Sequence, residues 1–123
     1  NICRDVFEDA ENDRIYLPAD LFSSPLKTSD LTSSDCVSRE ECTAAKLRLL
    51  QMADGLYARA DAGIDLLPLR IRIVVRWASR MYREIGNVIR NEPIHFHETR
   101  AIVKQPKKIF FLIECITRSL YKK

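Results

Sequence analysis

The stretch that decides the fold is residues 1–18, which reads NICRDVFEDAENDRIYLP. Asn1, Asp5 and Asp9 are spaced four residues apart. Because a helix turns about 100° per residue, their side chains would form one stripe along a helix. Two stacked carboxylates repel each other unless a cation lies beside them. Magnesium takes oxygen ligands and keeps waters and substrate phosphates in its shell, so it would suit a site of this kind.

The residues around these acids strengthen that interpretation. An isolated D-x-x-x-D is most often a solvated acidic helix face. Here Ile2, Val6 and Phe7 make the opposite flank apolar, and a compact apolar run that closes on a proline follows the acids. Arg4 and Arg14 bracket the stripe, where both could face the same phosphates.

The pattern N-x-x-R-D-V-x-E-D followed by R-I-Y-L-P resembles the second aspartate-rich motif of the squalene/phytoene synthase family. These are the head-to-head prenyl diphosphate synthases, and the I-Y-L-P ending is similar to their bacterial and plastid branch. Residues 57–68 resemble the family's Y-x-x-A-x-x-G-I-x-x-L-P, and residues 82–89 resemble its Y-x-x-I-L-x-x-I. The resemblance therefore covers nearly the whole chain.

The resemblance implies an all-α fold of the isoprenoid synthase type, a helical bundle around a deep apolar cavity. Residues 1–123 would form the C-terminal portion of one such domain, because the family's first aspartate-rich motif lies upstream and on the opposite wall. Prenyl diphosphates would be the substrates, and the missing N-terminal half of the fold would be a partner. The chain opens directly on a motif residue, so we expect a fragment that is inactive alone.

The implied reaction condenses two farnesyl or geranylgeranyl diphosphates head-to-head, in isoprenoid or carotenoid biosynthesis. The first product would be presqualene or prephytoene diphosphate, followed by squalene, dehydrosqualene or phytoene. Ionisation of the allylic diphosphate would depend on magnesium, or on manganese in its place. NADPH would be required only if the product is squalene. Prenyl chain length and final product stay open at this point.

The resemblance also implies which residues carry the reaction. The magnesium ligands would be Asn1, Asp5 and Asp9, and the catalytic set would be Asp5, Asp9 and Tyr82. Diphosphate would be bound by Arg4, Arg100 and Lys108, and the prenyl cavity would be lined by Tyr16 and Tyr82. The family usually has a further basic residue where this chain has Gln105 and Pro106.

The remaining pattern predicts helices joined by one long connection. Helices are expected over residues 1–12, 38–63, 68–91 and 107–121. Ser38 and Glu41 form a capping box for the second helix, and Gly63 is a plausible stop. The connection over residues 13–37 contains Pro18 and Pro25 and allows short turns near 19–22 and 29–31.

The helix over residues 68–91 carries an almost unbroken apolar stripe that includes Ile71, Val74 and Val75. Such a stripe is typical of a core face, with the arginines of the same helix on a wet flank. In the isolated chain we expect the apolar faces of residues 71–89 and 109–120 to lack their usual partners, and therefore to favour association.

Composition limits the other classes of function. The net charge of +3 is too mild to indicate nucleic acid. Four cysteines without C-x-x-C spacing indicate free thiols in a reduced, cytoplasmic compartment. The basic patch over residues 104–108 is compatible with a peripheral membrane contact, and His95 and His97 have no third metal ligand nearby.

The main alternative is a non-catalytic helical relative that acts as an assembly or scaffold protein. Such relatives are expected to lose their metal-binding acids, whereas Asn1, Asp5 and Asp9 are all present here. A lipid- or nucleic-acid-binding module rests only on the basic patch over residues 104–108 and is the weakest interpretation.

Overall fold

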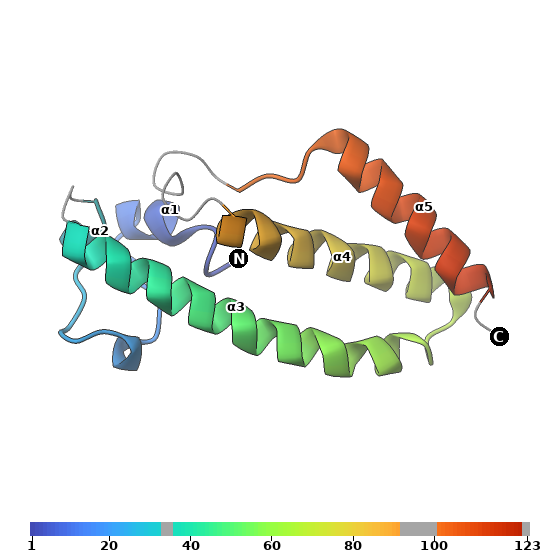
Figure 1. Ribbon diagram of the computed structural model, residues 1–123, viewed down its shortest axis with the longest axis horizontal. Coiled ribbons are helices and arrows are strands. Elements are labelled where there is room, and N and C mark those ends of the chain that lie inside the picture. The colour runs from blue at the N-terminus through green and yellow to red at the C-terminus, as the bar shows by residue number, and fades with distance from the viewer. Residues whose placement is uncertain (33–35, 92–100, 122–123) are drawn as a thin grey trace.

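The computed structural model describes residues 1–32, 36–91 and 101–121, and for residues 36–39 it describes the backbone only. These residues form helices and no strand, so the all-α fold class is confirmed. Figure 1 shows α3 and α4 running antiparallel, with α5 returning along α4. The elements are α1 (Val6–Glu11), the 3₁₀ turn η1 (Ala19–Leu21), α2 (Thr28–Thr32), α3 (Cys36–Ile64), α4 (Leu69–Asn91) and α5 (Gln105–Tyr121).

The N-terminal part of the chain, residues 1–32 with the first turns of α3, has a continuous apolar core. Its buried side chains are Val6, Ala10, Leu17, Leu31 and Cys42, with Phe7, Ile15, Phe22, Leu26 and Leu49 packed against them. Helix α1 ends at Glu11, and Asp13 then takes a left-handed conformation with φ of 55°. Aspartate tolerates this region, which turns the chain back so that residues 15–17 can join the core.

The expected helix boundaries hold in part. The structure confirms both short turns of the long connection, as η1 and α2. The predicted start of the first helix is wrong, because α1 begins at Val6 and the preceding residues form turns. The capping box is also wrong: α3 already begins at Cys36, and the Glu41 carboxylate accepts a hydrogen bond from the Ser23 hydroxyl at 2.6 Å.

Helices α3 and α4 form a long hairpin. Near its open end the two helices approach closely at Gly86, where an added Cβ would lie 3.1 Å from a methyl carbon of Leu50. A second apolar cluster forms there around Ile89 and Ala101 and includes Cys3 and Phe7. This cluster attaches the N-terminal segment to the C-terminal end of α4.

The orientation of α4 differs from the sequence expectation. The arginine face of α4, defined as Arg76, Arg80 and Arg83, turns toward α3 and α5, and Arg76 is only 6% exposed. The apolar stripe expected in the core is open at its N-terminal end instead, where Val74 is 61% exposed. The reason is that acids on α3, in the turn after it and on α5 pair with these arginines, and nothing among the described residues covers the apolar side at that end.

Within the described part of the chain, no helix is both long enough and apolar enough to cross a lipid bilayer.

Candidate substrate and metal site

The oxygen stripe, defined as Asn1, Asp5 and Asp9, lies on consecutive backbone turns although α1 begins only at Val6. The amide of Asp5 donates to the carbonyl of Asn1 at 2.9 Å, and the amide of Asp9 donates to the carbonyl of Asp5 at 2.8 Å. Both are i to i+4 bonds, so the three residues are one turn apart, as the sequence spacing predicts.

The carboxylate of Asp5 is shared with Arg4. The Arg4 guanidinium donates two hydrogen bonds to it, from Nε to Oδ1 at 2.7 Å and from Nη2 to Oδ2 at 2.8 Å. This bidentate pairing raises the pKa of Arg4 above its ordinary value, against the lowering effect of burial, and the nearby Tyr82 hydroxyl adds to the rise. Asp5 is therefore held in one orientation by a permanent cation.

The donor chemistry of the oxygen stripe suits a magnesium ion. It offers an amide oxygen and two carboxylates, the hard oxygen ligands that magnesium prefers. Two acids alone make a sparse site, and the described residues contain no group of three or more His, Cys, Asp or Glu side chains placed to bind a metal. A magnesium ion here would retain open positions for water or phosphate. The Asp5 carboxylate would then bind the ion while it also accepts the hydrogen bonds from Arg4.

A groove lies between α4, the start of α5 and the N-terminal turn. It has a volume of about 450 Å³ and opens to solvent. We call it the Tyr82 groove; its lining residues are Arg4, Met81, Tyr82, Ile85, Ala101, Ile102, Val103 and Lys108. Three of the site residues that the sequence predicted, Arg4, Tyr82 and Lys108, thus lie around one largely apolar space.

Lys108 lines this groove because α5 is anchored on α4 at its first turn. The indole N–H of Trp77 donates to the backbone carbonyl of Lys108 at 3.1 Å. The neighbouring Lys107 is ion-paired with Glu84 and packs over the ring of Phe111. Of these two lysines, Lys108 is therefore the one that the structure leaves beside the groove.

Other predicted residues lie elsewhere. Asp9 and Tyr16 share a separate shallow depression with Leu17 and Leu31, so Tyr16 and Tyr82 do not line the same space in this chain. Arg14 is exposed. Arg100, His95 and His97 lie outside the described residues.

Sequence reasoning missed part of the groove wall. Met81 and the segment formed by Ala101, Ile102 and Val103 line it, and Ile102 is exposed there. The spacing of Met81 beside Tyr82 and Ile85 on one helix side was available as an indication. The short apolar run over 101–103 is itself not helical, so helical periodicity gives no guidance there.

Comparison with known proteins agrees with this fold. Residues 1–107 match the model of the family described as squalene/phytoene synthase. The chain belongs to the squalene/phytoene synthase family. No solved structure matches the chain with statistical significance.

Several curated relatives share the sequence pattern. The chain is 33% identical over 113 residues to the 15-cis-phytoene synthase of Enterobacter agglomerans, covering 92% of this chain and 38% of that protein. It is 34% identical over 120 residues to the phytoene synthase of Cereibacter sphaeroides, covering 97% of this chain and 34% of that protein. A bifunctional lycopene cyclase/phytoene synthase of Gibberella fujikuroi is 36% identical over 112 residues, which cover 89% of this chain and 19% of that protein. The chain therefore spans less than two fifths of the length of these relatives.

Proposed function

We propose that this chain supplies one wall of the active site of a phytoene-synthase-like prenyltransferase, which joins two prenyl diphosphates head-to-head. The observation that carries the proposal is the position of Arg4. Its guanidinium pairs with Asp5 of the oxygen stripe and also lines the Tyr82 groove beside Lys108. One acid suited to a metal, Asp5, is thus bonded to a cation suited to a diphosphate, and that cation lines an apolar groove.

In the proposed reaction the residues of this chain stabilise the leaving diphosphate and protect the cation. The guanidinium of Arg4 and the ammonium of Lys108 would bind phosphate oxygens as negative charge develops on them. Met81, Tyr82 and Ile85 would pack against the prenyl chain and exclude water from the allylic cation. Magnesium bound at Asn1, Asp5 and Asp9 would add Lewis-acid stabilisation of the diphosphate.

A complete site needs a second wall. We propose that the partner wall, with another set of metal-binding acids, comes from polypeptide outside these 123 residues, since the relatives are far longer than this chain. The relatives are phytoene synthases, which favours phytoene over squalene and makes NADPH unnecessary. Manganese could replace magnesium, and a cytoplasmic location with peripheral membrane contact remains a proposal that fits the basic residues near the start of α5.

The alternative is a non-catalytic assembly protein. A protein of that kind does not need metal-binding acids. The presence of Asp5 and Asp9 therefore favours the enzyme.

The two functions are separated by binding of a prenyl thio-diphosphate, an analogue that resists ionisation. We expect the chain to bind it only with magnesium. We expect Asp5→Asn to abolish this magnesium-dependent binding. Asp20→Asn, which removes an exposed carboxylate on η1, is the matched control and should bind as the parent does. Circular dichroism should first confirm that Asp5→Asn keeps its helices. Magnesium-independent binding, or equal binding by the Asp5→Asn protein, would contradict the proposal.

A further inference from the structure

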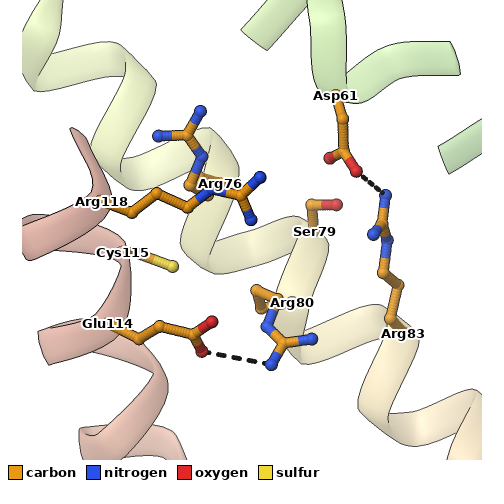
Figure 2. A pocket seen from close by; sticks show the side chains of 8 residues that line it. All are labelled: Asp61, Arg76, Ser79, Arg80, Arg83, Glu114, Cys115 and Arg118. Atoms are coloured by element: carbon orange, nitrogen blue, oxygen red, sulfur yellow. Dashed lines mark hydrogen bonds and ion pairs between the residues drawn. The ribbon is translucent and has the colours of Figure 1, made fainter. Parts of the chain in front are cut away.

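A second, smaller pocket lies between α3, α4 and α5, on the arginine face of α4 (Figure 2). We propose that this pocket, the arginine pocket, binds a single phosphate group. Its volume is about 70 Å³. The lining residues are Asp61, Arg76, Ser79, Arg80, Arg83, Glu114, Cys115 and Arg118.

The charge of the pocket is not balanced by its acids. Arg76 pairs with Asp65, Arg83 with Asp61 at 2.8 Å, and Arg80 with Glu114 at 3.2 Å. These three pairs leave one further guanidinium. Arg118 reaches from α5 toward α4 in Figure 2 and makes no hydrogen bond or ion pair with another described residue. The pocket therefore carries an excess positive charge that an anion would neutralise.

Two buried donors add to this excess. The Nε–H groups of Arg80 and Arg83 are shielded from solvent and have no hydrogen-bond partner among the described residues. A buried donor without an acceptor is costly, and native structures normally supply one. A phosphate group offers several acceptor oxygens, so it could satisfy such donors together with the free guanidinium of Arg118.

The donors are held in place before any ligand arrives. The Arg80 guanidinium lies 4.7 Å from the ring centroid of Phe111, and that of Arg83 lies 5.0 Å from the ring centroid of Tyr57. Each guanidinium is fixed on one side by packing against an aromatic ring and on another by its ion pair with an acid. The Arg76 guanidinium is likewise fixed, because it donates to the Ser119 hydroxyl at 2.8 Å. An anion would thus meet a preformed set of donors.

The size and position of the pocket distinguish it from the Tyr82 groove. A cavity needs roughly 10–15 Å³ to hold one water, so about 70 Å³ has room for several waters or one tetrahedral oxyanion. A prenyl diphosphate would not fit. Arg80 and Tyr82 are two residues apart on α4, which places them on opposite sides of the helix. The arginine pocket is therefore a separate site that does not depend on the proposed reaction.

A phosphate group could come from free phosphate or from the headgroup of a phospholipid. Exposed apolar side chains of α5, including Ile113 and Leu120, lie on the same helix as Arg118, so a lipid source is compatible with the surface. The two sources share the same contacts in the pocket and differ only in what the phosphate is attached to.

The test is calorimetric titration of the chain with inorganic phosphate at constant ionic strength, because surface charge effects vary with salt. A second arm measures sedimentation with phosphatidylcholine vesicles that do or do not contain phosphatidic acid. The variant is Arg118→Gln, which removes an exposed, unpaired guanidinium and should fold normally. The matched control is Arg59→Gln on the exposed side of α3, which removes the same charge away from the pocket.

We expect saturable phosphate binding by the parent and by Arg59→Gln, and binding about tenfold weaker or more for Arg118→Gln, the size expected for one charge-assisted contact. If only the phosphatidic acid vesicles bind, with the same dependence on Arg118, the site is a lipid headgroup site and the proposal stands. If neither ligand binds, or if Arg118→Gln and Arg59→Gln behave alike, the proposal is wrong and the arginines serve only to join the helices.

Discussion

The N-terminal part of the chain and the α3–α4–α5 part are stabilised in different ways. Around α1 and α2, buried apolar side chains such as Val6, Leu17 and Leu31 form one continuous core. Between the later helices, the arginine face of α4 forms ion pairs with acids of α3, of the turn after α3 and of α5. Much of the apolar surface of α4 and α5 remains exposed, with Val74 and Phe110 as examples.

In the proposed larger domain, this difference indicates which surfaces would contact the rest of the polypeptide. An isolated helix hairpin would normally bury its most apolar faces. Here polar pairs join the helices, and the apolar faces stay available. The chain spans less than two fifths of the length of its relatives. In the proposed larger domain, those apolar faces would form part of the core, which would explain why they are exposed in this chain.

The comparison can be tested most strongly with a matched pair of leucine truncations. Leu17 is 5% exposed and Leu56 is 58% exposed. Leu17→Ala should lower the free energy of unfolding by about 2–5 kcal/mol, because it leaves a cavity in the N-terminal core. Leu56→Ala should change it by no more than about 0.5 kcal/mol. Urea denaturation measures both, and similar losses for the two variants would contradict the division of the molecule.

The ion pairs of the α3–α4 hairpin and its connecting turn should differ in strength. Arg76 is buried and bonds to Asp65 and Ser119, whereas Arg90 pairs with the exposed Asp54 at 2.5 Å. Arg76→Gln should lower the free energy of unfolding by about 1–3 kcal/mol, because a partly buried ion pair with Asp65 and a buried hydrogen bond to Ser119 are lost. Arg90→Gln should lower the free energy of unfolding by between about 0 and 1 kcal/mol, as the loss of a surface ion pair typically does.

Thermal unfolding of the two arginine variants gives the measurement, and 1 M salt provides a control. The surface pair should be screened by salt, while the buried pair should be affected less. A larger loss of stability for Arg90→Gln than for Arg76→Gln would show that burial does not set the strength of these ion pairs.

The exposed apolar faces should cause self-association. Ile113 on α5 is exposed, and Ile113→Lys should raise the monomer fraction in sedimentation velocity with little change in the unfolding free energy. Thr117→Lys adds the same charge on the same helix and serves as the control. If both lysine variants raise the monomer fraction equally, charge repulsion rather than loss of an apolar contact is responsible for the dissociation.

A pH dependence should arise in the N-terminal part from Lys46. Burial lowers the pKa of this amine below its ordinary 10.5, although Cys42 and Cys3 oppose the shift. The unfolded chain then binds more protons between the lowered pKa and 10.5, so this residue's destabilising effect is full at lower pH and fades as pH rises through that window. Lys46→Met should therefore be more stable than the parent at pH 7.

The stability gap between Lys46→Met and the parent should narrow as pH approaches 10.5. Cys3 and Cys42 have a raised pKa from burial, and above about 9 they reduce the stability of both proteins, so comparing the two proteins largely removes their contribution. Guanidinium denaturation at a series of pH values measures the gap. A gap that widens with pH would mean that Lys46 is not penalised by burial.

Much of the fold could be predicted from residue patterns. The boundaries of α4 follow from Pro68 and from the apolar repeat, and the turns at η1 and α2 follow from prolines and serines. The burial of Arg76 was not predictable, because the sequence shows its charge but not that Asp65 and Ser119 lie across from it. Periodicity identifies two faces of a helix, and partners decide which one is covered.

The candidate site was predicted to a similar extent. The four-residue spacing of Asn1, Asp5 and Asp9 sets their consecutive turns. The meeting of Arg4 with Tyr82 and Lys108 depends on contacts between distant segments, which only the family resemblance suggested. The pairing of Arg4 with Asp5 adds a fact that neither spacing nor resemblance provided.

The acid–arginine pairs of the hairpin also bear on how the chain folds. The partners in the pairs of Asp65 with Arg76, Asp61 with Arg83 and Asp54 with Arg90 are separated by 11, 22 and 36 residues. Once the innermost pair closes beside the tight connection, each later pair needs only a short additional loop to close, which costs little chain entropy. Contacts of this local kind favour rapid folding. The hairpin could thus form early and present the surface onto which α5 and the N-terminal segment assemble.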